Sequence, residues 1–312
     1  MLTRNLGRSG LRVSLVGLGC NNFGGRIDLE ATRKVVDAAI EHGITLFDTA
    51  DIYGNRGGSE AALGEVLGAR RKQIVLATKF GMNMDEEGLK KGGSRAYIMN
   101  AVEDSLRRLR TDWIDLYQIH RPDPLTPIDE TLRTLEDLIR QGKVRYIGCS
   151  NLPSWQVADA HWTAKTHGIE GFASCQDEYS LLVRGAEKEL IPAARYFGMG
   201  LLPYFPLANG LLTGKYRRNQ PMPEGARMTR EAQRAGEVLT EENWRKTEKL
   251  AAFCEKHGKT LVELAFSWLA AQPVVSSVIA GATRPEQIAA NVKAAEWKLS
   301  AEELAEIDQI TA

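Results

Sequence analysis

The 312-residue sequence predicts an α/β protein that folds as one domain, a (β/α)8 or TIM barrel spanning residues 1–312. Short apolar segments of strand length alternate with longer amphipathic segments of helix length along the chain. Several predicted helices end in a polar residue and Gly, as at His42-Gly43 and His167-Gly168, directly before the next apolar segment. This near-regular spacing, in a chain of this length, favours a closed barrel of parallel strands over an open doubly wound sheet.

The eight strands of the predicted barrel begin near Leu15, Ile44, Ile74, Ile114, Val144, Phe172, Leu201 and Val275. The helices that connect them are predicted near residues 28–42, 58–67, 94–109, 127–141, 154–167, 185–197, 241–257 and 285–295. An N-terminal β-hairpin, an extra helix and a C-terminal helix lie outside the repeat, at residues 2–13, 260–271 and 300–310. No linker or low-complexity segment divides the chain, so we expect a single domain.

The composition argues against several classes of function. Lys plus Arg and Asp plus Glu number 40 each, so the net charge is zero and does not favour binding to nucleic acid or to an acidic membrane surface. No apolar run reaches the roughly 18 residues of a membrane span, and the N-terminus lacks the apolar core of a signal peptide. The four cysteines show no metal-ligand spacing and fit reduced thiols. We therefore expect a cytoplasmic protein without a metal, either a monomer or a homo-oligomer.

The glycine-rich segment at residues 17–24 needs to be distinguished from a dinucleotide-binding fingerprint. Its spacing is G-x-G-x-x-x-x-G rather than G-x-G-x-x-G, and the next predicted helix begins only near Asp28. A Rossmann fold is therefore not predicted. The glycines instead allow the backbone to approach a ligand closely at the mouth of the barrel.

Four ionisable residues are predicted to meet at one end of the barrel. Asp48, Lys79 and His120 lie at the ends of three successive apolar strands, and Tyr53 lies in the loop that follows Asp48. The carboxyl ends of barrel strands share one face, where barrel enzymes build their active sites. A carboxylate at a strand end is costly to bury unless a cation meets it, and Lys79 can supply that cation.

These residue types suit acid–base chemistry at an oxygen atom. A phenol with the usual pKa of about 10 holds its proton at neutral pH. We expect the Lys79 ammonium, positioned by Asp48, to lower that pKa, so that Tyr53 can act as a general acid. His120 can donate a hydrogen bond to the same oxygen, an arrangement that suits hydride addition to a carbonyl. A structural Asp–Lys pair with two bystanders remains the alternative.

Seven motifs, in order and at similar spacing, resemble those of the aldo-keto reductases, and the resemblance covers about residues 2–310. Three of them contain the four ionisable residues and lie at residues 47–54, 77–79 and 118–123. The other four lie at residues 148–151, 176–180, 206–216 and 281–291. The branch that the sequence most resembles contains bacterial reductases and the β-subunits of voltage-gated potassium channels.

The resemblance implies NADPH or NADP+ as the cofactor, with weaker use of NADH, and a small carbonyl or alcohol as the substrate. It matches four residues to the catalytic set, with Tyr53 as the proton donor: Asp48, Tyr53, Lys79 and His120. The implied cofactor contacts are Gly19, Cys20, Asn21, Asp48, Ser150, Asn151, Gln176, Tyr204, Pro206, Leu207, Gly210, Lys215, Gly281, Thr283, Arg284, Gln287 and Asn291.

The resemblance also divides this set by role. The residues implied to hold the nicotinamide carboxamide are Ser150, Asn151 and Gln176. The nicotinamide ring is implied to stack on Tyr204, and the pyrophosphate to lie along residues 206–215 with Lys215 as a charge partner. The 2′-phosphate is matched by Thr283 and Arg284, and the adenine by Gln287 and Asn291. From the residues alone, Thr283 is predicted to be the N-cap of a helix whose first turn contains Pro285 and can bind phosphate.

The substrate pocket is expected to be open and to involve Phe23, Tyr53, Met82 and His120. Residues 217–235 are polar, rich in Arg and contain two prolines, which predicts a mobile lid loop. The predicted function is NADPH-dependent reduction of aldehydes and some ketones to alcohols. Two alternatives remain: an NAD(P)-dependent dehydrogenase of a sugar or pyridoxal-like alcohol, and a weakly active NADPH-binding redox-sensor subunit.

Overall fold

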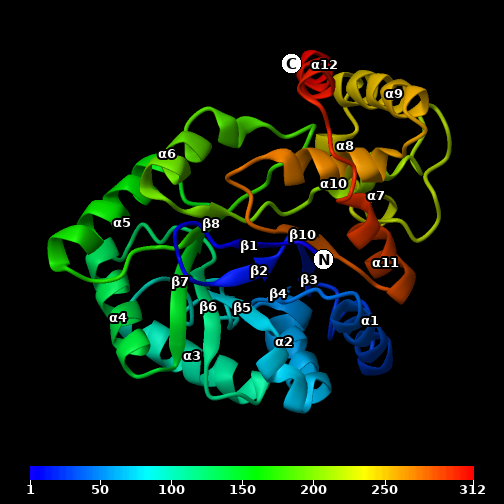
Figure 1. Cartoon of the computed structure of the whole chain (residues 1–312). Coiled ribbons are helices and arrows are strands. Elements are labelled where there is room, and N and C mark those ends of the chain that lie inside the picture. The colour runs from blue at the N-terminus through cyan, green and yellow to red at the C-terminus, as the bar shows by residue number, and fades with distance from the viewer.

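The computed structural model describes residues 1–312 and has the predicted barrel architecture (Figure 1). Eight parallel strands follow one another around the sheet in chain order, and the last strand pairs with the first. They are β3 (Val16–Gly19), β4 (Leu46–Asp48), β5 (Val75–Phe80), β6 (Ile114–Ile119), β7 (Val144–Ser150), β8 (Ser174–Gln176), β9 (Gly200–Leu201) and β10 (Val278–Gly281). Every strand is almost entirely buried, as expected for a parallel sheet covered by helices.

Backbone hydrogen bonds beside β9 close the sheet into a barrel. The N–H of Leu201 donates to the carbonyl of Val274 (2.8 Å), and the N–H of Ser276 donates to the carbonyl of Leu201 (2.9 Å). Val275, which lies between them, bridges to Leu201 in parallel orientation. The last strand, predicted to begin near Val275, thus makes its first contact there, although regular pairing in β10 begins at Val278.

The helices that cover the outside of the barrel are α1 (Leu29–Glu41), α2 (Tyr53–Leu67), α3 (Arg95–Leu109), α4 (Ile128–Arg140), α5 (Ser154–His167), α6 (Leu190–Phe197), α10 (Leu261–Ala271) and α11 (Pro285–Ala294). Further helices are α7 (Arg227–Arg230), α8 (Ala232–Val238), α9 (Glu241–Lys256) and α12 (Ala301–Thr311). Residues 54–57 in the first turn of α2 are not helical, so its regular part matches the predicted 58–67. The predicted helix at 185–197 is instead a 3-10 turn, Gly185–Glu187, followed by α6.

One pair of helices has exchanged the predicted roles. The prediction placed 241–257 in the barrel and 260–271 outside it, but α10 packs against α11 and β10, whereas α9 lies beside α12 at the edge of the molecule (Figure 1). The reason is the apolar content of α10, in which Leu264, Phe266 and Trp268 are fully buried. A helix that is apolar on nearly all sides needs a buried position, and α9 is amphipathic.

The N-terminal hairpin closes the amino end of the barrel. It consists of β1 (Thr3–Asn5) and β2 (Arg12–Ser14) paired in antiparallel fashion. Leu6 and Val13 of the hairpin region pack inside the barrel in a cluster completed by Leu46, Ala77, Leu116, Leu202 and Ile279. The larger apolar core lies between the sheet and its helices. Since this end is filled, a ligand reaches the barrel from the carboxyl ends of the strands.

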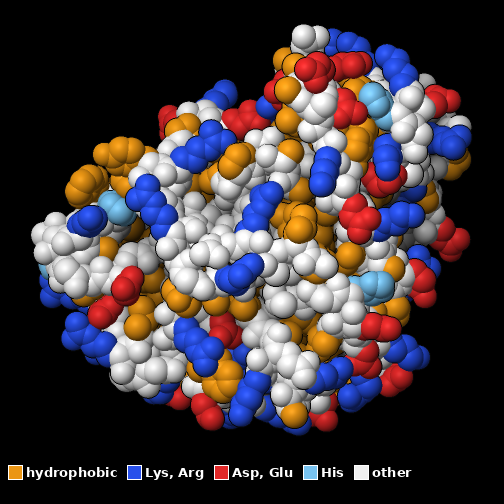
Figure 2. Space-filling view, in the orientation of Figure 1, with side chains coloured by type: hydrophobic (Ala, Val, Ile, Leu, Met, Phe, Trp, Pro, Cys, Tyr) orange, Lys and Arg blue, Asp and Glu red, His pale blue; other side chains and the backbone are white.

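The surface mixes charges of both signs. Figure 2 shows Lys and Arg side chains interspersed with Asp and Glu over the visible face, without a large area of one sign.

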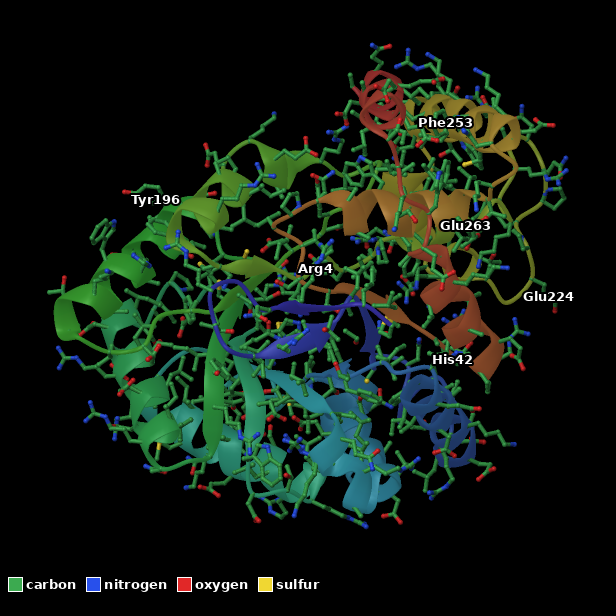
Figure 3. The ribbon with its side chains drawn as sticks, in the orientation of Figure 1. Arg4, His42, Tyr196, Glu224, Phe253 and Glu263 are labelled. Carbon is green, nitrogen blue, oxygen red and sulfur yellow. The ribbon has the colours of Figure 1, made fainter.

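His42, the C-cap residue of α1, lies at the end of that helix as its sequence position predicts (Figure 3). None of the helices combines the length and the hydropathy that a crossing of the lipid bilayer requires.

Arg4 joins the hairpin to the end of α10 (Figure 3). Its guanidinium donates to the carbonyl oxygens of Ala270 (2.6 Å), Gln272 (3.2 Å) and Val275 (2.6 Å). These carbonyls lie at and just after the end of α10, where helical carbonyls lack partners within the helix. Arg4 therefore links the cap of the barrel to the segment that closes the sheet.

Replacing Arg4 with Met is expected to lower the free energy of unfolding by about 2–3 kcal/mol, because hydrogen bonds from a charged donor to half-buried carbonyls are lost. Urea unfolding, followed by circular dichroism, measures this change. Arg12→Met is the control on the same hairpin, since Arg12 is exposed and donates only to the Thr3 hydroxyl. Equal unfolding midpoints for the two variants would show that the Arg4 bonds do not stabilise the fold.

Candidate active site

A buried ion pair occupies the carboxyl ends of β4 and β5. The Nζ atom of Lys79 lies 2.7 Å from Oδ2 of Asp48 and also donates to the carbonyl of Thr49 (2.9 Å). The Lys79 side chain has no exposed surface. Burial lowers the pKa of Lys79, but the charges of Asp48 and Tyr53 and their hydrogen bonds together raise it above its usual value. Lys79 is therefore a permanent cation at neutral pH.

The second oxygen of Asp48 is held by two amide groups. Oδ1 accepts hydrogen bonds from Nε2 of Gln176 (2.9 Å) and Nε2 of Gln118 (3.3 Å). Both glutamines are buried, Gln118 on β6 and Gln176 on β8. A buried ion pair is stable only when its remaining lone pairs are satisfied, and these amides satisfy them.

Tyr53 lies beside this pair because of an unusual turn. Residues 54–57 all have positive φ angles, and a Cβ at Gly54 would lie only 2.6 Å from the carbonyl oxygen of Phe23. A glycine is therefore required there. The turn places the Tyr53 ring 5.1 Å from Nζ of Lys79 and, edge to face, 5.7 Å from the ring of His120. The structure thus brings Asp48, Tyr53, Lys79 and His120 together as the sequence predicts.

The net shift in the pKa of Tyr53 is upward, although the protonated form is the one predicted. Burial raises the pKa of Tyr53, and the Asp48 charge adds to this effect, whereas the charge of Lys79 and its hydrogen bond lower it. Lys79 thus acts in the predicted direction, but the net pKa lies above the usual value because burial has the larger effect. Desolvation of the phenolate outweighs a cation whose charge is largely balanced by Asp48. At neutral pH the phenol keeps its proton.

His120 follows β6 and is neutral. Burial, together with the positive charges of Lys79 and Arg121, lowers its pKa to about 2. Its Nδ1 atom is buried without a hydrogen-bond partner. A neutral imidazole still carries one N–H, so His120 can donate one hydrogen bond without bringing a second full charge beside Lys79.

The residues matched to the nicotinamide form one hydrogen-bonded chain. Tyr204 donates from its hydroxyl to Oδ1 of Asn151 (2.7 Å), and Nδ2 of Asn151 donates to the Ser150 hydroxyl (2.8 Å) and to the His120 carbonyl (3.1 Å). Ser150 in turn donates to the carbonyl of Gln176 (2.8 Å). Both N–H groups of Asn151 are thus used within the protein. The chain fixes the position of the Tyr204 ring relative to Asp48.

A cavity of about 700 Å³ opens at this end of the barrel. Its walls include most of the predicted site residues, namely Gly19, Cys20, Asn21, Asp48, Tyr53, His120, Ser150, Asn151, Gln176, Tyr204, Pro206, Leu207, Gly210, Lys215, Gly281, Thr283 and Gln287. Lys79 lies behind Asp48 and Tyr53. The predicted residues outside the walls are Phe23, Met82, Arg284 and Asn291. Phe23 is fully buried in the apolar core, so its predicted contact with substrate is not supported.

Other residues of the cavity wall were not predicted individually, although Asn209 lies in the segment matched to the pyrophosphate and three others lie in the predicted lid segment 217–235. They are Asn22, Arg26, Arg121, Glu178, Phe205, Asn209, Arg227, Glu231, Arg234, Ile279 and Ala280. Arg121 could have been identified from the sequence, because it directly follows His120 in the motif at residues 118–123. Asn209 lies within the segment 206–215 that the resemblance matched to the pyrophosphate; it is buried in a left-handed conformation and has no hydrogen-bond partner for either atom of its amide.

Residues 217–235, predicted to be a mobile lid loop, contain regular secondary structure that the sequence did not predict. They contain α7 and most of α8, and Met228 is buried with its N–H bonded to the Tyr216 hydroxyl (3.2 Å). The guanidinium groups of Arg227 and Arg234 lie 5.1 and 5.2 Å from the centre of the Phe205 ring. Cation–π contacts of this kind hold the segment against the cavity.

The N-terminus of α11 also differs in detail. Arg284, not Thr283, is the N-cap residue, and Pro285 occupies the first turn as predicted. Thr283 instead donates from its N–H (2.8 Å) to the side-chain oxygen of Gln287. Arg284 is exposed. A phosphate at this position would meet the positive end of the helix dipole and a free guanidinium.

The charges of the cavity fit a dinucleotide. Arg26 and Lys215 line the wall without any carboxylate within ion-pairing distance. Burial lowers the pKa of Lys215, and the charges of Arg26, Arg227 and Arg230 lower it further. Cations held this close together are stabilised by an anion such as a pyrophosphate. The unpaired amide of Asn209 lies in the same wall. No cluster of three or more His, Cys, Asp or Glu side chains is arranged to hold a metal.

Comparison with known proteins agrees with this geometry. Residues 15–312 match the Aldo/keto reductase family. The uncharacterized oxidoreductase YrpG of Bacillus subtilis is 39% identical, over 98% of this chain and 94% of that protein. A probable voltage-gated potassium channel subunit beta of Arabidopsis thaliana is 36% identical, over 94% of this chain and 91% of that protein.

A third relative has a stated substrate. L-glyceraldehyde 3-phosphate reductase of Escherichia coli O157:H7 is 35% identical, over 99% of this chain and 92% of that protein. These relatives confirm the branch that the motifs predicted. The chain belongs to the aldo/keto reductase family and is an NAD(P)H-dependent oxidoreductase that acts on the carbonyl–alcohol couple.

Proposed function

We propose that this chain reduces aldehydes, and some ketones, to alcohols with NADPH, and that Tyr53 is the proton donor. The observation that supports this most is the state of the acid–base residues. A phenol holds its proton at neutral pH, burial raises the pKa of Tyr53 further, and Tyr53 lies at the cavity beside a neutral His120. A carbonyl oxygen placed between them meets two uncharged donors, with the Lys79 cation close behind.

Each residue of the site has its own role in the proposed reaction. His120 donates a hydrogen bond to the substrate oxygen and orients the carbonyl. Lys79, held by Asp48, stabilises the negative charge that grows on that oxygen and on Tyr53 as the proton leaves. Bound NADPH supplies the hydride. Ser150, Gln176 and Tyr204 position the nicotinamide, and Lys215 and Arg26 hold the pyrophosphate.

The same protonation state argues against a dehydrogenase at neutral pH. Oxidation of an alcohol needs a base, which here is the Tyr53 phenolate. Because the pKa of Tyr53 lies above the usual value, little phenolate is present near pH 7. Oxidation of a sugar or pyridoxal-like alcohol should therefore need a higher pH than aldehyde reduction does.

A panel of aldehydes, ketones and alcohols, read by the absorbance of the reduced cofactor, tests the proposal. NADPH and NADH are compared in parallel, and glyceraldehyde 3-phosphate is included because a relative is named for it. Rapid aldehyde reduction with NADPH supports the proposal. Tight NADPH binding with almost no turnover of any aldehyde would favour a redox-sensor subunit instead.

Arg284→Ala is expected to weaken NADPH binding roughly 10- to 150-fold and NADH binding much less, since only NADPH carries the 2′-phosphate that this guanidinium binds. Dissociation constants from cofactor fluorescence measure both effects. Lys293→Ala, at the other end of α11, is the control and should change neither constant. Equal losses for the two cofactors in Arg284→Ala would exclude Arg284 as the phosphate-binding residue.

A further inference from the structure

The charged side chains of the cavity wall fall into two groups. The carboxylates on the wall all have cationic partners: Asp48 with Lys79 (2.7 Å), Glu178 with Arg234 (3.3 Å) and Glu231 with Arg227 (4.0 Å). The wall cations without a carboxylate within ion-pairing distance are Arg26, Lys215 and Arg121. In the proposed function, two of these three, Arg26 and Lys215, bind the pyrophosphate of the cofactor.

Arg121 lies apart from that pair. Besides burial, Arg227 and Arg230 lower the pKa values of both Arg26 and Lys215, and Arg26 also lowers that of Lys215, whereas Arg121 contributes to neither shift. The groups whose pKa values Arg121 does lower are His120, Asp177 and Tyr204, at the catalytic end of the cavity. Its guanidinium is therefore near the reacting centre rather than near the pyrophosphate.

The acidic groups near Arg121 do not neutralise it. Asp123, two residues further on, accepts hydrogen bonds from the N–H groups of Gly93 and Leu125 and from the Thr126 hydroxyl. Asp177 is beyond ion-pairing distance, and burial raises its pKa to about 7, so it is only partly ionised at neutral pH. Arg121 thus retains a net positive charge at the mouth of the catalytic pocket.

We infer that Arg121 selects substrates in which the aldehyde carries an anionic group, a phosphate or a carboxylate. The inference rests on the proposed aldehyde reduction and adds to it the substrate class and the residue that recognises it. Arginine presents a planar fork of donors that matches either anion in bidentate fashion. The anion on Arg121 fixes one end of the substrate, and His120, the preceding residue, orients the carbonyl at the other.

The test compares matched pairs of aldehydes at saturating NADPH. Glyceraldehyde 3-phosphate is paired with glyceraldehyde, and 4-oxobutanoate is paired with butanal. The measured quantity is the ratio of kcat/KM for the anionic member to kcat/KM for the neutral one. We expect the wild type to favour at least one anionic member by tenfold or more, and the pair that shows this preference identifies the anion as phosphate or carboxylate.

Arg121→Met removes the charge and keeps much of the aliphatic stem. We expect it to lower the ratio roughly 10- to 100-fold, mostly through a higher KM for the anionic aldehyde, since hydrogen bonds to a charged group are lost. Arg121→Lys should restore part of the ratio, because it keeps a cation without the bidentate fork. Lys215→Met is the matched control for an unpaired cavity cation; it should weaken NADPH binding and leave the ratio unchanged.

Three results would overturn the inference: a wild type without preference in either pair, an unchanged ratio in Arg121→Met, or an equal fall of the ratio in Lys215→Met. A wild type that reduces no aldehyde at all contradicts the proposed function itself. Reduction of the neutral aldehydes without an anionic preference contradicts only the role of Arg121.

Discussion

Tyr53→Phe is expected to lower kcat/KM for aldehyde reduction by about 10²-fold or more, the range for loss of a general acid, while NADPH binding stays nearly unchanged. The substitution removes one oxygen atom and keeps the ring that packs beside Lys79 and His120. The shape of the cavity is therefore preserved. What is lost is the only phenol next to the buried Asp48–Lys79 pair.

Steady-state kinetics and NADPH fluorescence titration measure the two effects separately. Tyr196→Phe is the matched control, because Tyr196 is exposed on α6 (Figure 3) and is not part of the cavity wall. It should behave as the wild type does. If Tyr53→Phe retained activity within a few-fold of the wild type, another group would have to donate the proton.

The sequence allowed the position of the reacting residues to be predicted because parallel barrel strands all end on one face. Asp48, Lys79 and His120 could be placed together from strand ends alone, and the ion pair followed from the cost of burying an isolated carboxylate. The turn that brings Tyr53 into the same group depends on four consecutive positive φ angles, which local sequence preferences do not predict for Arg56.

Long-range packing and charge balance could not be predicted from the sequence. Which of the helices at 241–257 and 260–271 joins the barrel depends on how much apolar surface each one buries against neighbours distant in sequence. The order of residues 217–235 depends on two arginines that meet Phe205. The sign of the Tyr53 pKa shift depends on the depth of burial, which opposes Lys79 and has no local sequence signature.

Lys79→Met is expected to reduce turnover severely in both directions and to move the remaining alcohol oxidation to higher pH. Lys79 is the group that lowers the pKa of Tyr53 against the effects of burial and of Asp48. Its removal leaves the Asp48 charge uncompensated, so the pKa of Tyr53 rises further. The developing negative charge on the substrate oxygen also loses its nearest cation.

The direction of each pH profile follows from the form of Tyr53 that reacts. Reduction needs the phenol, so kcat/KM should stay level through neutral pH and fall only as the pH passes the raised pKa. Oxidation needs the phenolate, so it should increase over that same range. In Lys79→Met, the pH at which reduction falls and the pH at which oxidation rises should both be higher than in the wild type.

The single substitution leaves a buried carboxylate without its cation, which costs roughly 3–5 kcal/mol and endangers folding. The double variant Asp48→Asn, Lys79→Met removes both charges and serves as the second protein for the same measurement. Its remaining shift should reflect burial alone, since neither charge acts on Tyr53. The profiles of kcat/KM against pH are recorded in both directions for wild type and variants. A folded variant whose oxidative profile coincides with that of the wild type would show that Lys79 does not control the ionisation of Tyr53.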